Sequence, residues 1–238
     1  MRNVWTITTR ELNSYFVSPV AYVVSAAFLL ISGVLFSLII TSTLQASLNG
    51  AFGNITFILI LVAPILTMKL LAEEVRMGTL ELLLTSPVDD WQVVVGKYLG
   101  SLILFAVMLL APTLVYVVFL VAFGQPDFGP IISGYLGVLL LGGAFLAVGV
   151  LASSLTQNQV VAGFLGIVFL LLMWISDALN QIVGGGAVGS ALSYLSITQH
   201  YNDFLSGVIA TPNIIYPLSV IAVSLFIATQ VLQTRRWR

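Results

Sequence analysis

Cysteine is absent from this 238-residue chain, and histidine occurs once, at His200. Without cysteine the chain has no disulfide, no thiolate metal ligand and no cysteine nucleophile. A single histidine also excludes a metal centre built from several histidines. Charged residues are scarce as well, at 7% of the sequence, whereas an average soluble domain carries roughly a quarter. A water-soluble fold cannot cover its surface with so few charges, so the composition predicts a protein embedded in the bilayer.

The sequence also lacks G-x-x-x-x-G-K-[ST], the phosphate-binding loop of many nucleotide-hydrolysing proteins. Its Lys and Arg residues are scattered in short groups, unlike the clusters that bind nucleic acid. Lys69 and Asp177 lie at the ends of apolar runs, and no charge lies in the middle of one. Ion-coupled pumps generally keep charged residues in their pathways. We therefore expect neither nucleic acid nor an ion gradient to be involved, and we expect any ATP to be bound by a partner chain.

Apolar residues are abundant, at 59% of the chain. A spanning helix needs about 20 predominantly apolar residues. Six runs meet or approach this length, at residues 20–42, 54–72, 97–123, 131–155, 160–176 and 214–232. The fifth run is short, which indicates either a tilted helix or a re-entrant continuation through 178–198. The first run is too long for a signal-peptide core, which has about 7–15 residues, so we expect it to persist as a span.

With six spans, every positively charged residue falls on one side of the membrane: Arg2, Arg10, Lys69, Arg76, Lys97, Arg235, Arg236 and Arg238. The two long loops on the other side, 124–130 and 177–213, contain acidic residues but no Lys or Arg. The positive-inside rule then predicts that both termini and the 73–96 segment are cytoplasmic. An odd number of spans would separate the terminal arginine groups, which favours six. We expect one all-α membrane domain over residues 1–238.

Residues 2–16 have the pattern of a helix that lies on the membrane surface. At helical spacing Trp5, Leu12 and Phe16 share one stripe, and polar residues occupy the rest of the circumference. A solvated N-terminal helix is the alternative. Ser18-Pro19 is expected to end this helix and to begin the first span.

The segment after the second run, residues 73–90, combines charges with leucines. This pattern favours a short amphipathic helix on the cytoplasmic surface, ended by Pro87. Asp89 is in the position of an N-cap for the next helix, and Gln92 three residues on would complete a capping box. The leucines offer apolar area to a docking partner, and the charged residues would fix how that partner is oriented. A solvated surface loop is the alternative.

Several glycines have spacings that suit close helix packing. Gly96 and Gly100 form a G-x-x-x-G pair, which is typical of a close helix crossing. Gly163 and Gly166 in the fifth run would allow two protomers to approach closely, with ordinary packing inside one chain as the alternative.

The long loop 177–213 contains the candidates for an outer gate that meets substrate: Asp177, His200 and Asp203. His200 and Asp203 are three residues apart, which is also the spacing of an acid–base pair. The alternatives are a structural hydrogen bond for His200 and a charge at the headgroup level for Asp177.

Four segments and the C-terminal tail are weak signals singly, but together and in this order they indicate a family. The first is Trp5 to Glu11, and the second is Glu-Glu-x-Arg-x-Gly-Thr-Leu-Glu-Leu-Leu-Leu-Thr-x-Pro at 73–87, followed by Asp-Trp and Gly-Lys-Tyr. The others are 153–162, 195–209 and the Arg-Arg-Trp tail at 235–237. Together they resemble the type-two ABC exporter permeases over the whole chain, and within them the gliding-motility permease group. The sequence departs from that group at residues 210–213, which are uncharged here, whereas charged residues are commoner there in the group.

This resemblance implies a non-catalytic permease subunit of an exporter in a bacterial or archaeal cytoplasmic membrane. A separate ATP-binding subunit, which holds ATP and Mg²⁺, would dock on the 73–87 loop as a coupling helix. A second permease protomer, identical or homologous, would complete a pathway through the lipid bilayer. The positions expected to contact the ATP-binding subunit are Glu73, Glu74, Arg76, Gly78, Thr79, Leu80 and Glu81. The leader helix and the 153–159 loop would lie near the same subunit.

Two other functions stay open. The first is a membrane anchor that recruits a soluble partner through the same loop without transport. The second is a membrane-embedded lipid-modifying enzyme, although such a site needs clustered Asp, His or Ser–Lys pairs that the apolar runs lack. A pathway walled by Leu, Val, Phe and Gly suits an amphiphilic or lipid-linked cargo better than a small ion.

Overall fold

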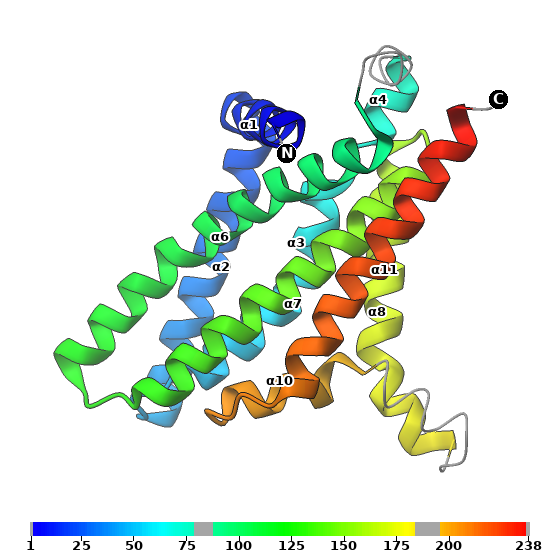
Figure 1. Cartoon of the computed structure of the whole chain (residues 1–238). Coiled ribbons are helices and arrows are strands. Elements are labelled where there is room, and N and C mark those ends of the chain that lie inside the picture. The colour runs from blue at the N-terminus through cyan, green and yellow to red at the C-terminus, as the bar shows by residue number, and fades with distance from the viewer. Residues whose placement is uncertain (1, 79–87, 184–195, 237–238) are drawn as a thin grey trace.

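The computed structural model describes residues 2–78, 88–183 and 196–236. Within these ranges every regular element is an α-helix (Figure 1). The helices are α1 (Arg2–Val17), α2 (Pro19–Thr43), α3 (Asn49–Thr67), α4 (Ala72–Met77), α6 (Asp90–Phe123), α7 (Phe128–Leu155), α8 (Gln159–Val183), α10 (Ile197–Leu205) and α11 (Thr211–Arg236).

Six helical segments are long and apolar enough to cross a membrane: Pro19–Thr43, Asn49–Met77, Asp90–Phe123, Phe128–Leu155, Gln159–Ser176 and Thr211–Thr234. This confirms the prediction of an all-α chain with six spans. The N-terminus, α4 and the end of α11 lie at one end of the bundle, as an even number of spans requires (Figure 1). We call it the basic end, because the described Lys and Arg side chains belong to it. The α6–α7 connection and α10 lie at the opposite end.

A turn interrupts the helix of the second span, Asn49–Met77, which the apolar run did not predict. The run was expected to be helical to residue 72, but α3 ends at Thr67 and a turn over residues 68–71 precedes α4. In this turn the Leu70 N–H donates to the Thr67 carbonyl at 3.0 Å, so the Leu66 carbonyl loses its helical partner. Hydropathy misses this boundary because the residues of the turn are themselves largely apolar.

The expected amphipathic helix after the second span is shorter than proposed. Helix α4 ends at Met77, and Gly78 follows with φ +69° in the left-handed region. A residue with this backbone conformation ends a helix, and glycine adopts it without steric cost. One continuous helix from residue 73 to Pro87 is therefore wrong. Residues 79–87 lie outside the described part of the chain.

Helix α6 begins where the sequence predicted, but its first turn has different hydrogen bonds. Asp89 is the N-cap residue, yet its side chain accepts no backbone N–H. Instead Gln92 Nε2 donates to Asp89 Oδ2 at 3.1 Å, while Gln92 Oε1 accepts from Asn3 Nδ2 of α1 at 3.2 Å. The capping box is therefore wrong, because Gln92 bonds to side chains on either side of it.

The fifth span ends at Ser176, as the apolar run predicted. Helix α8 itself continues to Val183, beyond the part that is apolar enough to cross a membrane. Residues 184–195 lie outside the described ranges. The part of the outer segment that follows contains α10, whose Ile197, Tyr201 and Phe204 are buried. This helix packs on α7, where Phe204 lies against Gly137 and its carbonyl accepts from the Ser133 hydroxyl at 2.6 Å.

Helices α3 and α7 form the centre of the bundle. In their apolar stretches 67% and 78% of residues are buried, compared with 17% in α2. Glycines of α7 allow the close approach: a Cβ at Gly134 would lie 2.6 Å from the Phe52 ring. In a bilayer, helices associate through such close packing because lipid tails are as apolar as the helices.

Gly163 and Gly166 also pack within the chain. A Cβ at Gly166 would lie 2.9 Å from Pro64, and one at Gly163 would lie 3.4 Å from the Met68 sulfur. Both positions lie on α8 where it contacts α3. The structure therefore uses these glycines for packing inside one chain, which was the simpler of the two readings.

Candidate functional site

The G-x-x-x-G pair of α6 is the place where α1 crosses this helix. A Cβ at Gly96 would lie 2.8 Å from Ile7, and one at Gly100 would lie 2.9 Å from Glu11 Cβ. Between them Thr8 is fully buried, and its hydroxyl donates to the Gly96 carbonyl at 3.1 Å. The close crossing predicted from the spacing is confirmed, and its partner is the N-terminal helix.

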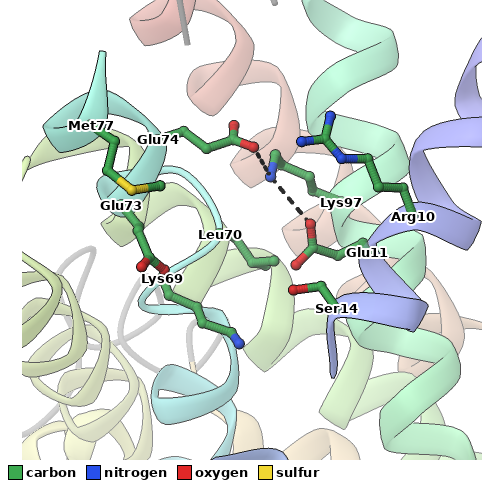
Figure 2. Close-up of a pocket in the computed structure, with 9 residues that line it drawn as sticks. All are labelled: Arg10, Glu11, Ser14, Lys69, Leu70, Glu73, Glu74, Met77 and Lys97. Carbon is green, nitrogen blue, oxygen red and sulfur yellow. Dashed lines mark hydrogen bonds and ion pairs between the residues drawn. The ribbon is translucent and has the colours of Figure 1, made fainter. Parts of the chain in front are cut away.

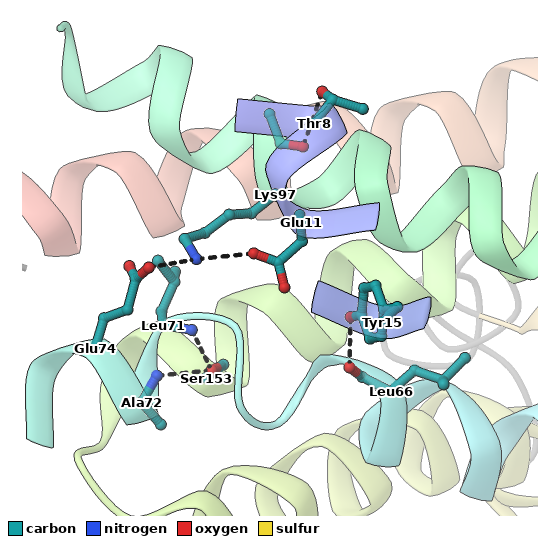
Figure 3. Close-up of polar contacts among 10 residues, drawn as sticks. Thr8, Glu11, Tyr15, Leu66, Leu71, Ala72, Glu74, Lys97 and Ser153 are labelled. Carbon is teal, nitrogen blue, oxygen red and sulfur yellow. Dashed lines mark hydrogen bonds and ion pairs between the residues drawn. The ribbon is translucent and has the colours of Figure 1, made fainter. Parts of the chain in front are cut away.

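Next to this crossing, Lys97 joins three helices through two ion pairs. Its ammonium lies 2.8 Å from Glu74 of α4 and 3.2 Å from Glu11 of α1 (Figure 3). The exposed fractions of the side chains are 4% for Lys97, 13% for Glu11 and 19% for Glu74. An ion pair with so little water around it is costly to break, because the partner left behind stays buried without a counter-charge. Lys97 therefore ties α1, α4 and α6 together.

A second polar contact attaches the start of α4 to the end of α7. The hydroxyl of Ser153 accepts the N–H groups of Leu71 and Ala72 at 3.1 and 3.0 Å (Figure 3). It donates to the Met68 carbonyl at 3.0 Å and is fully buried. The first N–H groups of a helix have no partner within it. Ser153 therefore caps α4 from another helix.

Tyr15 attaches α1 to the end of α3. Its hydroxyl donates to the Leu66 carbonyl at 2.7 Å, and Lys69 Nζ lies 5.0 Å from the centre of its ring. Burial raises the pKa of Tyr15 well above its ordinary value, and the negative charge of Glu11 adds to the rise. The hydroxyl therefore keeps its proton, and remains a donor, at neutral pH.

These contacts surround a cleft of about 250 Å³ at the basic end (Figure 2). It is lined by Arg10, Glu11, Ser14, Lys69, Leu70, Glu73, Glu74, Met77 and Lys97. Three cations and three carboxylates thus meet between α1, α6 and the α3–α4 region. The cleft offers charge contacts that can hold helices together or exchange partners. It presents no nucleophile paired with a general base among the residues that line it.

The residues expected to bind an ATP-binding subunit are only partly described. Glu74 points into the chain at Lys97, Arg76 is exposed, and Gly78 ends α4. Thr79, Leu80 and Glu81 lie outside the described residues. Contact of these positions with a partner stays a prediction.

Of the residues expected at an outer gate, His200 and Asp203 make separate contacts. The His200 ring stacks on Tyr216 at 4.1 Å, with Nδ1 2.9 Å from the Ser196 carbonyl. Asp203 instead accepts from Asn213 Nδ2 at 2.7 Å. Each therefore has the structural contact that was the alternative to an acid–base pair. Asp177 lies in α8, and its side chain is outside the description.

Lys97 and Glu11 were not among the predicted site residues. Lys97 is 86 positions from Glu11 (97 − 11) and 23 positions from Glu74 (97 − 74) in the sequence, so no local spacing connects the three residues. The adjacent Gly96 and Gly100 were the available signal, since a close crossing beside a lysine brings that lysine near the crossing helix.

Six apolar helices with a charged cluster at one end define a multi-pass membrane protein. Residues 6–236 match the family described as ABC-2 family transporter protein, and the chain belongs to this family. A comparison with curated proteins found no match. The family assigns the chain to the permease subunits of ABC transporters, which work with an ATP-binding partner.

Proposed function

We propose that this chain is the permease half of an exporter driven by a separate ATP-binding subunit that docks at the basic end. The family match over residues 6–236, in a chain without a phosphate-binding loop, carries this proposal. The proposed docking segment, residues 73–87, begins with α4 directly after the second span. Its motif also supports assignment to the gliding-motility-type group of permeases.

In the proposed cycle, ATP and Mg²⁺ bind to the partner subunits and draw them together. The 73–87 segments move with these subunits, and the spans change between two arrangements. ATP shifts this equilibrium only if it binds the two states with different affinity. A second protomer, identical or homologous, completes the pathway. The distribution of Lys and Arg supports cytoplasmic termini, and the resemblance to the permease family supports a bacterial or archaeal membrane.

The proposed cargo is amphiphilic or lipid-linked. Helices α2, α8 and α11 bury only 17%, 28% and 22% of their apolar stretches, so they offer large apolar surfaces to lipid or cargo. The described cations and carboxylates concentrate at the basic end and leave the middle of the spans apolar.

Affinity capture of the tagged chain from its native membrane tests the proposal. The captured partner should contain a phosphate-binding loop. Glu81→Arg should weaken its binding by about 2–5 kcal/mol, since a reversed charge in an interface leaves its partner unpaired. Gln125→Arg introduces a positive charge at the opposite end and should leave co-purification unchanged. Equal capture by the parent and Glu81→Arg chains would contradict the docking segment.

Reconstitution separates the transporter from its two rivals. A transporter couples ATP hydrolysis by the partner to movement of an amphiphilic probe across the vesicle membrane. A membrane anchor permits hydrolysis without flux. Turnover of lipid by the purified chain without its partner would instead indicate a membrane-embedded enzyme.

A further inference from the structure

Helix α4 is attached to the bundle by two polar contacts of different kinds. At its start, Ser153 of α7 holds the backbone N–H groups of Leu71 and Ala72. One turn further, the Glu74 side chain pairs with Lys97 at 2.8 Å. The hydrogen bonds to Ser153 fix only the first residues of α4, so α4 can rotate about its start. Glu74 lies further along α4 and moves with the helix when it rotates.

Lys97 passes this contact on to α1. The same ammonium that pairs with Glu74 lies 3.2 Å from Glu11, which is packed against Gly100. Because glycine at this position allows α1 to approach so closely, the Glu11 carboxylate reaches an almost fully buried lysine. A displacement of Glu74 therefore acts on α1 as well as on α6.

Helix α1 in turn is joined to α2 through a single residue, Ser18, whose backbone is extended (φ −80°, ψ 121°). Only Ser18 separates Val17 from Pro19, and its N–H still donates to the Ser14 carbonyl at 3.1 Å. Helix α2 is the least packed of the spans, with 17% of its apolar stretch buried against 67% for the α3 segment. A span with few packing contacts is moved at lower cost than one at the centre of the bundle.

From these contacts we infer that α1 is a second moving element of the permease. Ser153 is the hinge of α4, and Lys97 is the positioning residue that links α4 to α1. Movement of α4 is thereby delivered to α2 through α1 rather than to α3 alone. That an ATP-binding subunit moves α4 rests on the proposed function. The link between α4 and α1 through Lys97 does not.

The absence of cysteine makes the link directly measurable. Spin labels at Asn13→Cys on α1, Met77→Cys on α4 and Leu155→Cys on α7 occupy exposed positions. In lipid nanodiscs the parent should give one narrow distance distribution for the 13–77 pair and one for the 77–155 pair. Glu74→Gln should broaden the 13–77 distribution and leave 77–155 narrow, whereas Ser153→Ala should broaden 77–155.

Lys97→Met should act like Glu74→Gln on the 13–77 pair. Glu74→Gln is the safer variant, because it removes a carboxylate and keeps the Lys97–Glu11 pair that holds α1 on α6. Arg10→Met is the matched control: it removes a cation that lines the same cleft, at an exposed position. It should leave both distributions unchanged. An unchanged 13–77 distribution in both Glu74→Gln and Lys97→Met would overturn the link.

The complex with the ATP-binding subunit tests the transmission. Trapping ATP in a hydrolysis-deficient partner should shift the 77–155 and 13–155 distances in the parent. In Glu74→Gln the 77–155 shift should persist and the 13–155 shift should be lost. If 77–155 shifts but 13–155 does not in the parent, or if Glu74→Gln keeps both shifts, the inference is wrong. No shift at all in the parent complex would contradict both the proposed function and the transmission.

Discussion

Buried polar side chains decide how the basic end of this chain is held together. Lys97, Ser153 and Tyr15 come from three helices, and each binds the stretch from the end of α3 to α4, residues 66–74. All three are nearly or fully buried, so each contact is made in a place with little water to replace it. Residue types alone predict that such groups need partners, but they do not identify the partners.

Removal of the Tyr15 hydroxyl tests this view at a single atom. Tyr15→Phe leaves the Leu66 carbonyl without its donor at 2.7 Å. Loss of a buried hydrogen bond should lower the free energy of unfolding by about 1–2 kcal/mol. Tyr22→Phe is the control, because its hydroxyl donates to the Phe16 carbonyl at an exposed position where water substitutes. Thermal unfolding in detergent measures both, and equal losses would contradict the assigned role of Tyr15.

The crossing of α1 and α6 shows what a pair of elements can reveal from sequence. The spacing of Gly96 and Gly100 predicted a close crossing, and the structure confirms it. The identity of the crossing helix was not predictable, because α1 was assigned to the membrane surface from its apolar stripe. Trp5 and Phe16 of that stripe are exposed in the described chain, while Thr8 and Tyr15 face the protein.

Gly100→Leu should detach α1 from α6. A side chain at this position meets Glu11 Cβ at 2.9 Å, and overpacking of this kind costs about 1–3 kcal/mol. The maleimide labelling rate of Thr8→Cys, buried in the parent, should then rise about tenfold, as a shift of roughly 1.4 kcal/mol implies.

Gly53→Leu is the control for this substitution. Apart from its chain neighbours and the nearby backbone of its own helix, no atom lies within 4 Å of a Cβ at Gly53, so the same added side chain meets open space. Labelling of Thr8→Cys should stay slow in this variant. Slow labelling in Gly100→Leu would show that the crossing tolerates a side chain and that the glycine spacing is not what permits it.

The whole molecule is organised by the contrast between its two ends. The N-terminus, α4 and the end of α11 share the basic end, and α10 covers the opposite end of α7 (Figure 1). The positive-inside rule then orients the molecule with its basic end toward the cytoplasm. This orientation is a proposal that follows from the distribution of Lys and Arg together with the even number of spans.

Single cysteines test the orientation. An impermeant maleimide added to intact cells should label Gln125→Cys and Asn202→Cys, which are exposed at the opposite end. Asn13→Cys and Gln157→Cys are exposed at the basic end and should react only after the membrane is permeabilised. Labelling of Gln157→Cys in intact cells would reverse the orientation and exclude a cytoplasmic ATP-binding partner at α4.

The sequence by itself determined that this protein is embedded in the bilayer, how many times it crosses the bilayer and to which family it belongs. The first two follow from composition and from apolar runs of membrane length, which are properties of single segments, whereas the family follows from the resemblance of motifs such as residues 73–87. The sequence did not predict where helices α3 and α4 end, since those ends depend on the turn over residues 68–71 and on the backbone of Gly78. Only the tertiary structure decided that Lys97 meets Glu11 and Glu74, because residues far apart in the chain become neighbours only when three helices pack around the same point.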